Sequence, residues 1–278
     1  MRLCFNVRFI YFLSDQTGVT AETLGHSLIT QFDDEDFQQV TLPFIDSEDK
    51  AKEVVLKINS AITETSSKPI IFSTLVREEL RTIVRQINGL HLDIFDVFIE
   101  PLEQELKQKS ASKSGLAHGM SDTKNYMDRI EATNFALSND DGGITKHYDK
   151  ADIILVGVSR SGKTPTCLYL AMQYGVYAAN FPLTEHELEK GLIPASLNEF
   201  RRKLFGLTIA PDRLRQIRKE RRSIGNYSSI KQISYEVREA EKLFKKNAIK
   251  FIDTTELSIE EISGKILEET GIQRRFRP

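Results

Sequence analysis

The first hundred residues alternate short apolar runs with longer segments in which apolar positions recur at helical spacing. Runs rich in aromatic and β-branched residues predict four strands, at 5–13, 40–45, 69–75 and 92–98. Helical spacing predicts three intervening helices, at 21–32, 48–65 and 77–87. Strands that alternate with helices in this way predict a mostly parallel sheet covered by helices.

The second half of the chain repeats this kind of pattern after a polar interruption. Residues 107–115 are small, polar and basic, which is typical of a linker or loop. Beyond them the pattern predicts strands and helices in alternation: strands at 151–156, 176–181 and 251–255, and helices at 120–137, 165–174 and 230–247. Ser258 and Glu261 are spaced to cap a final helix.

A glycine-rich motif lies between the strand at 151–156 and the helix at 165–174. It fits G-x-x-x-x-G-K-[ST] at every fixed position, and its residues are Gly157, Val158, Ser159, Arg160, Ser161, Gly162, Lys163 and Thr164. The glycines allow backbone N–H groups to close around phosphate oxygens, and the start of the following helix adds positive potential. Lys163 would reach the outermost phosphates, and the Thr164 hydroxyl would hold Mg²⁺. The strand and helix on either side favour a nucleotide site over an incidental glycine turn.

These patterns predict an α/β protein with two domains. We expect an N-terminal, mostly parallel α/β domain at 1–105 and a linker with a helical segment at 106–150. The remaining residues, 151–278, are expected to form a P-loop kinase-like α/β domain that binds the nucleotide.

The acid that commonly completes such a Mg²⁺ site is not evident. No hydrophobic strand that ends in Asp follows the motif closely, and Asp253, the nearest candidate, comes very late in the chain. Asp140 and Asp141 lie in a polar turn at 139–143, where they could help to hold Mg²⁺ or could simply face solvent. The metal-holding acid therefore stays unassigned at this stage.

The most basic part of the chain follows the motif, at 197–222. It contains nine cationic residues, which are Arg201, Arg202, Lys203, Arg213, Arg215, Arg218, Lys219, Arg221 and Arg222. Arginines near a phosphate site can clamp phosphoryl oxygens and neutralise charge in the transition state. A solvated helix face is the competing explanation for most of the nine.

Composition and charge narrow the classes of function. The chain has 278 residues, 40% apolar and 28% charged, as in an ordinary globular protein. A net charge of −2 gives no general reason to bind nucleic acid or an anionic membrane, and no stretch approaches the length of a transmembrane helix. The two cysteines, Cys4 and Cys167, form no disulfide framework, so we expect a reducing, cytoplasmic setting.

Beyond the glycine-rich motif, the sequence resembles the phosphoenolpyruvate synthase regulatory proteins, which are relatives of the pyruvate, phosphate dikinase regulatory proteins. The resemblance runs nearly end to end and is carried by segments 157–166 with 168–171, 20–26, 118–120 with 129–132, 140–142, and 203–209. Gln16 departs from the pattern, because many members have Gly there, whereas Asp15 and Thr17 remain.

The resemblance implies a bifunctional, ADP-dependent serine/threonine protein kinase and phosphate-dependent pyrophosphorylase. Members transfer the β-phosphate of ADP to a threonine of the target synthase and thereby inactivate it. They also remove that phosphate with inorganic phosphate, which releases pyrophosphate and restores activity. Phosphoenolpyruvate synthase is thus the expected protein substrate, with ADP, Mg²⁺ and inorganic phosphate as the small molecules involved.

The role of each residue follows from this resemblance and from the motif. We expect Lys163 and Arg160 to act catalytically on the phosphates, and Thr164 to hold Mg²⁺. Asp15 is the candidate base for the threonine hydroxyl, because its loop follows a parallel strand and should face the ligand crevice. Arg218, Arg221 and Arg222 are candidates for a lid.

Three alternatives stay open. The same chemistry could act on pyruvate, phosphate dikinase, or the protein could be an ATP-dependent small-molecule P-loop kinase. A third possibility is a regulator that senses a nucleotide and binds its partner without chemistry. The sequence also leaves open the oligomeric state, a homodimer included, and what sets the direction of the reaction.

Overall fold

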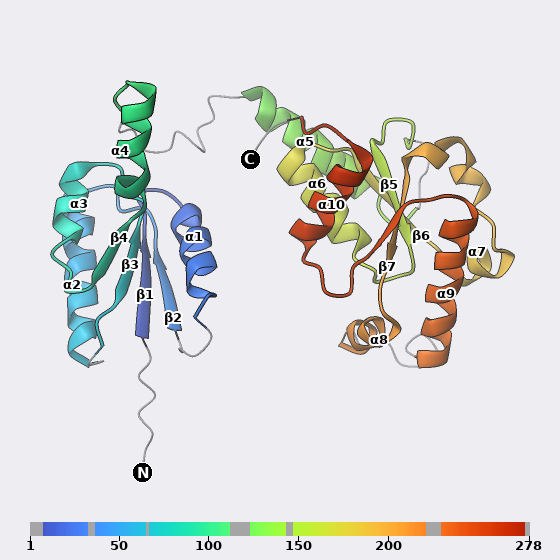
Figure 1. The fold of residues 1–278 in the computed structure, drawn as a ribbon, viewed down its shortest axis with the longest axis horizontal. Helices are drawn as coiled ribbons and strands as arrows, with labels where there is room; N and C mark the ends of the chain where they lie inside the picture. The colour runs from blue at the N-terminus through green and yellow to red at the C-terminus, as the bar shows by residue number, and fades with distance from the viewer. Residues whose placement is uncertain are drawn as a thin grey trace, which may run out of the picture. The chain divides into compact units, whose positions relative to one another are not determined.

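The computed structural model describes residues 8–32, 37–64, 67–111, 123–142, 147–220 and 229–275. The chain divides into two compact units, Met1–Gly119 and Met120–Pro278. Each unit contains a parallel four-stranded sheet covered by helices, which confirms the α/β class (Figure 1). The segment 106–150 is shared between the units, and its helix belongs to the second one.

The first unit alternates strands and helices over its whole described length. Its elements in chain order are β1 (Arg8–Leu13), α1 (Val19–Ile29), β2 (Phe37–Leu42), α2 (Glu48–Glu64), β3 (Ile70–Ser73), α3 (Glu78–Val84), β4 (Leu90–Asp93) and α4 (Ile94–Leu106).

The sheet of the first unit has the strand order β2-β1-β3-β4, and every neighbouring pair is parallel. Side chains alternate between its two faces, so Tyr11 and Leu13 pack with α2 and α3, whereas Ile10 and Phe12 pack with α1. Because both faces are covered, β1 is apolar from its second residue, Phe9, to its end, as expected for a strand buried on both sides.

The predicted strand at 92–98 is wrong beyond its second residue. Strand β4 ends at Asp93, and the residues that follow form helix α4. The Asp93 carboxylate caps this helix, because it accepts hydrogen bonds from the backbone N–H groups of Phe95 and Asp96. An apolar run of this length fits either a strand or a helix, and here the cap decided the outcome.

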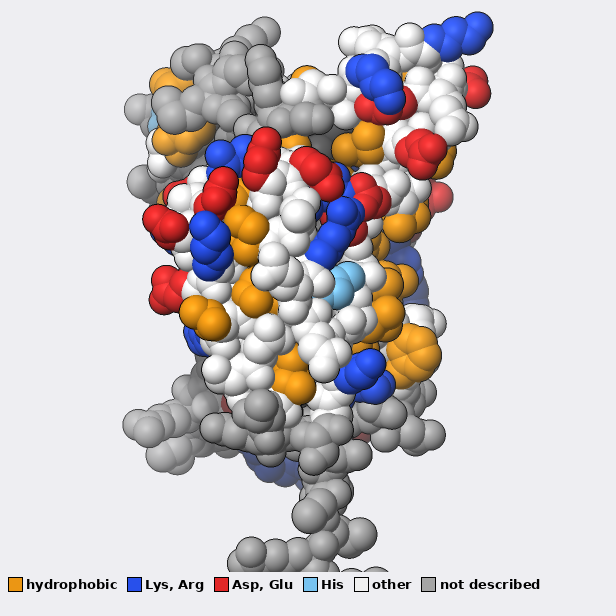
Figure 2. All heavy atoms as spheres, turned by 90° about the vertical axis from the view of Figure 1, so that its left-hand side faces the viewer, with side chains coloured by type: hydrophobic (Ala, Val, Ile, Leu, Met, Phe, Trp, Pro, Cys, Tyr) orange, Lys and Arg blue, Asp and Glu red, His pale blue; other side chains and the backbone are white. Residues whose placement is uncertain are grey.

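The surface of the first unit carries charges of both signs. On the face drawn in Figure 2, Lys and Arg side chains lie among Asp and Glu side chains, with hydrophobic residues between them. Lys50 pairs with Asp46, and Lys52 pairs with Glu48, at helical spacing. Mixed charge of this kind agrees with the small net charge of the chain.

The second unit contains the glycine-rich motif. Its elements in chain order are α5 (Thr123–Ser138), β5 (Ile153–Gly157), α6 (Lys163–Tyr174), β6 (Ala178–Pro182), α7 (Glu185–Lys190), the 3₁₀ helix η1 (Ala195–Lys203), β7 (Leu204–Thr208), α8 (Pro211–Glu220), α9 (Ile230–Lys246), β8 (Phe251–Asp253) and α10 (Ile259–Thr270).

The second sheet has the order β6-β5-β7-β8 and is also parallel. Helices α5, α6 and α10 cover one face through a buried cluster that includes Ala132, Cys167 and Ile262. Helices α7, α8 and α9 cover the other face, and the two layers are visible on either side of the sheet in Figure 1. Strand β6 lies on one side of β5, and the next strand in the chain, β7, lies on the other side. Parallel sheets commonly bind ligands at the carboxyl ends of strands beside such a switch in strand order.

Strand β7, which lies between β5 and β8, is not among the strands predicted from the sequence. Its residues form a fully buried apolar run, but they follow directly on the cationic residues of η1. Gly206 is needed within this strand, because a Cβ there would lie 2.7 Å from the Cβ of Phe251. The apolar composition of residues 204–208 would have predicted this buried strand, but the cationic residues just before it made the segment look exposed.

Candidate functional site

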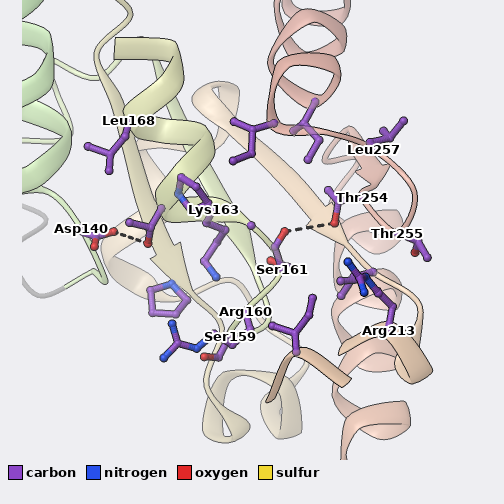
Figure 3. A pocket seen from close by; sticks show the side chains of 18 of the residues that line it. Asp140, Ser159, Arg160, Ser161, Lys163, Leu168, Arg213, Thr254, Thr255 and Leu257 are labelled. Carbon is purple, nitrogen blue, oxygen red and sulfur yellow. Dashed lines mark hydrogen bonds between the residues drawn. The ribbon is translucent and has the colours of Figure 1, made fainter. Parts of the chain in front are cut away.

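A cavity of about 640 Å³ opens at the carboxyl end of strand β5, within the size range of small-molecule sites. The glycine-rich loop, defined here as Gly157–Thr164, forms one wall. Figure 3 shows Lys163 between Asp140 on one side and Thr254 and Thr255 on the other. The strand, the loop and the helix thus have the order that the motif predicts.

The backbone of the loop turns sharply enough to form a cradle. Gly162, the N-cap of helix α6, has φ 92°, and Arg160 has φ 75°. Gly162 adopts this conformation without strain, since it has no Cβ. A Cβ at Gly157 would collide with the carbonyl oxygen of Leu207, so the loop lies directly against strand β7. The start of α6 therefore faces the cavity with its unpaired N–H groups, which favour an anion.

Lys163 is the principal cation of the cavity. Its side chain is only 5% exposed, and Nζ donates a hydrogen bond to the Val158 carbonyl oxygen at 2.9 Å. Burial lowers the pKa of Lys163 to about 8, although the nearby carboxylate of Asp141 opposes the shift. A lysine held in this way is poised to exchange a loop carbonyl for a phosphate oxygen.

Thr164, Asp140 and Asn180 form a polar cluster beside the lysine. The Thr164 hydroxyl donates to Asp140 Oδ1 at 2.9 Å. Asn180 Nδ2 donates to Thr164 Oγ1 at 3.0 Å and also to Asp140 Oδ1. Thr164 and Asp140 are both candidates from the sequence, whereas Asn180 is not, because it follows two alanines in an apolar strand without any motif.

The opposite wall is formed by the segment after β8. The Thr254 hydroxyl donates to the carbonyl oxygens of Ser161 at 3.3 Å and Thr208 at 3.0 Å, which ties the loop to two strands. Apolar side chains also line this cavity, among them Leu168, Leu257 and Ile262. An aromatic base could bury its faces against such residues while its phosphates reach the loop.

Arg218 supports the loop from behind. It is fully buried, and its Nη2 donates to the Ser159 carbonyl oxygen at 3.1 Å and to Glu236 Oε2 at 2.7 Å. This position differs from the lid role expected for it, because a fully buried side chain in an ion pair cannot move freely. Arg221 and Arg222 lie outside the described residues. Arg213, by contrast, is exposed and lines the cavity.

Six of the eight predicted loop residues, Ser159 to Thr164, line the cavity, whereas Asp15 belongs to the first unit. Asp15 is 5% exposed, and its Oδ2 accepts a hydrogen bond from the Val76 N–H at 3.3 Å. Its loop does follow the carboxyl end of strand β1, as predicted. Asp15 does not line this cavity, so its role as a base stays a prediction.

The oxygens of the cavity suit Mg²⁺ better than a transition metal. Thr164 and Asp140 offer hydroxyl and carboxylate oxygens, the hard ligands that Mg²⁺ prefers. No group of three or more His, Cys, Asp or Glu side chains converges among the described residues, so a tight all-protein metal cage is absent from that part of the chain. Mg²⁺ held by few protein ligands together with phosphates fits this arrangement.

Within the described residues, no helix has the length and apolarity needed to cross a membrane.

Comparison with known proteins agrees with this geometry. The family model described as Kinase/pyrophosphorylase matches residues 10–267. The chain is 54% identical to the "Putative phosphoenolpyruvate synthase regulatory protein" of Stutzerimonas stutzeri over 270 residues, which are 97% of this chain and 99% of that protein. A protein of the same name from Pseudomonas aeruginosa is 53% identical over 270 residues, again 97% of this chain and 98% of the relative. The chain belongs to the kinase/pyrophosphorylase family.

Proposed function

We propose that this protein reversibly phosphorylates a threonine of phosphoenolpyruvate synthase, with ADP as phosphoryl donor and inorganic phosphate as acceptor in the reverse direction. The names of the relatives supply the target, and the family supplies the two kinds of phosphotransfer. The observation that carries the chemistry is Lys163, buried inside the glycine-rich loop and directed into a cavity of nucleotide size.

In the forward direction the threonine oxygen attacks the β-phosphorus of ADP. The bond between that phosphorus and the oxygen bridging to the α-phosphate breaks, and AMP leaves. The loop N–H groups and Lys163 stabilise the negative charge that spreads over the phosphoryl oxygens. The threonine proton passes to a base, for which Asp15 is the candidate from the sequence, and Arg160 at the loop tip is suited to contact the transferred group.

In the reverse direction an oxygen of inorganic phosphate attacks the phosphorus of phosphothreonine. The bond from that phosphorus to the threonine oxygen breaks, pyrophosphate forms, and the threonine oxygen regains a proton. A cradle that binds the diphosphate of ADP also fits pyrophosphate, so the same loop can serve both directions. Bound Mg²⁺ would neutralise phosphate charge during transfer, with Thr164 among the groups that hold it.

The decisive experiment is to measure phosphothreonine on purified phosphoenolpyruvate synthase incubated with this protein and Mg²⁺. ADP, and ATP freed of ADP, are supplied separately. We expect modification with ADP alone, and its reversal with release of pyrophosphate when inorganic phosphate is added. Modification by ATP alone would make the protein an ordinary protein kinase. A lack of modification of the synthase, with modification of pyruvate, phosphate dikinase, would reassign the target.

The variant Lys163→Ala separates chemistry from simple docking. If the protein acts as an enzyme at this site, the variant loses both directions of transfer while it still binds the synthase. Inhibition of the synthase that survives in the variant would instead indicate a regulator that acts by binding. Binding is measured by co-sedimentation, and transfer is measured by phosphothreonine content.

A further inference from the structure

In many phosphate sites an acidic residue at the end of a neighbouring strand holds Mg²⁺, but the ends of β7 and β8 place no carboxylate in this cavity. Strand β7, beside the loop strand β5, ends at Thr208, whose hydroxyl donates to Glu241 Oε1 at 2.9 Å. Asp253, at the end of β8, is exposed and accepts hydrogen bonds from Thr255. Neither Glu241 nor Asp253 lines the cavity. Among the described residues, Asp140 and Asp141 are the two carboxylates that do so.

The turn that carries Asp140 is fastened to strand β6. The Asn180 N–H donates to the Asn139 carbonyl oxygen, and the Gly142 N–H donates to the Asn180 carbonyl oxygen, both at 3.1 Å. Gly142 has φ 66°, and a Cβ there would lie 2.8 Å from the Phe181 ring, so this turn requires glycine at that position. Asp140 is therefore held in place by the backbone on both sides of it.

Asp140 lies directly beside the residue predicted to hold the metal. The hydroxyl of Thr164 donates a hydrogen bond to Asp140 Oδ1, and its oxygen accepts one from Asn180 Nδ2, which leaves one lone pair of that oxygen for a cation. A hydroxyl that gives its proton to a carboxylate is a better metal ligand, since the carboxylate increases the electron density on the oxygen. The pair thus offers two hard oxygen ligands in contact with each other.

The burial of the polar Asn180 side chain is not explained by packing within strand β6. It is 1% exposed in the middle of β6, between Ala179 and Phe181, where an apolar residue would cost less to bury. Its Oδ1 has no hydrogen-bond partner in the described part of the chain. The side-chain hydrogen bonds recorded for Asn180 are those that Nδ2 donates to Asp140 and Thr164.

A neutral amide suits this position better than a cation would. Lys or Arg would fix Asp140 equally well but would cancel its charge and remove its attraction for a divalent ion. The amide of Asn180 orients the carboxylate and leaves the negative charge in place. Hydrogen-bond partners that orient metal ligands in this way commonly change metal affinity about 10- to 100-fold when removed.

We propose that Asp140 is the carboxylate that holds Mg²⁺ beside Thr164, and that Asn180 is the positioning residue that orients it. The acid would thus come from a turn that precedes the glycine-rich loop in the chain, and not from a strand that follows it. This inference rests on the proposed nucleotide site but is independent of which protein is the phosphoryl acceptor.

The test is the affinity of the full chain for ADP, measured by calorimetry with Mg²⁺ and again with EDTA. In the unmodified protein, Mg²⁺ should strengthen ADP binding. Asp140→Asn should reduce this gain by about tenfold or more. In EDTA its affinity should stay unchanged or improve, because a carboxylate close to phosphates repels them. Asp141→Asn is the matched control, since it removes the same charge from the same cavity, and its loss of the Mg²⁺ effect should be clearly smaller.

Asn180→Ala tests the positioning role separately. It should raise the Mg²⁺ concentration needed for half-maximal ADP binding by about tenfold, with a smaller change in EDTA. Val176→Ala, which truncates another fully buried side chain next to the same strand, controls for a general loss of packing. It should lower thermal stability without moving the Mg²⁺ titration.

Three results would overturn the proposal. The first is an unchanged Mg²⁺ gain in Asp140→Asn, and the second is equal losses in Asp140→Asn and Asp141→Asn, which would indicate charge alone. The third is a Mg²⁺ titration that shifts as much in Val176→Ala as in Asn180→Ala. A native protein that binds ADP but fails to modify the synthase would sink the proposed target and leave this inference standing.

Discussion

The two units of this protein share a frame and differ in chemistry. Their sheets have the same strand order, in which the second strand lies on one side of the first and the third and fourth lie on the other. In both units, residues 14–18 and 158–162 respectively lead from the first strand into a helix. Both loops end in a glycine that caps the helix in the left-handed conformation, Gly18 with φ 84° and Gly162 with φ 92°.

The side chains at matching places in the two loops have opposite character. The first residue of the helix is Val19 in the first unit, 55% exposed, and Lys163 in the second, 5% exposed. The second loop position is Asp15 in the first unit and Ser159 in the second. A buried carboxylate repels phosphate, whereas a buried lysine attracts it. We therefore expect the second loop to bind a phosphate and the first loop not to, although their backbones are alike.

The largest expected difference between the units is at these first helical positions. Lys163→Ala should lower transfer in both directions by about 10²- to 10³-fold, because it removes the principal cation from the phosphates. Val19→Ala should leave both rates within about twofold, as expected for an exposed surface position. Phosphothreonine formation and pyrophosphate release measure the two directions. A near-normal rate in Lys163→Ala in either direction would contradict a shared site.

The hydroxyls one residue further along give the next test. Thr164→Ala should weaken ADP binding in Mg²⁺ by about 10- to 100-fold, because it removes a ligand and a partner of Asp140. Thr20→Ala, at the matching exposed position of α1, should leave ADP affinity unchanged. Calorimetry in Mg²⁺ gives both values. A similar loss in the two variants would mean that the first unit also binds the nucleotide.

Lys163 should also make ADP binding depend on pH. The matching residue of the first unit, Val19, has no ionisable side chain and cannot produce such an effect. In the free protein its pKa is lowered to about 8, and bound phosphates favour the charged form. ADP affinity should therefore fall above pH 8, by up to about tenfold per pH unit. The same lowered pKa affects the stability of the free protein. Between the pKa of Lys163 in the folded protein and its ordinary value of 10.5, the unfolded chain binds more protons than the folded one. The free energy of unfolding should therefore increase as the pH rises through that window. Calorimetry at pH 7, 8 and 9 tests the first effect, and a profile for Lys163→Ala as steep as the native one would refute it.

The smallest expected effects concern the helix caps. Asp93→Ala should destabilise the protein by about 1 kcal/mol or somewhat more, because it removes the cap of α4 and a partner of Arg81. Ser258→Ala should cost about 1 kcal/mol, through the capping box of α10. Asp93→Asn keeps the cap and loses the ion pair, so its difference from Asp93→Ala measures the cap alone. Urea unfolding followed by circular dichroism compares the three, and equal stability of Asp93→Asn and Asp93→Ala would assign the effect to the ion pair.

Much of the fold followed from local patterns. The glycine-rich loop was predictable because every atom of its backbone cradle comes from consecutive residues. The caps of α10 and the strand β5 were predictable for the same reason. The strand predicted at 92–98 was wrong because the carboxylate that caps helix α4 was not recognised as a helix start. Strand β7 was missed because the cationic residues of η1 precede its apolar run directly.

The site divides in the same way. The sequence by itself determined the loop, Lys163 and Thr164, since consecutive residues are held together by the chain. The tertiary structure decided which distant groups meet them: Asp140 from the preceding turn, Asn180 from strand β6, and Thr254 from the end of the second sheet. It also buried Arg218 against Ser159 and Glu236, where the sequence suggested a mobile lid. These contacts join residues far apart in the chain, and only the order of the parallel strands places them at one edge of the sheet.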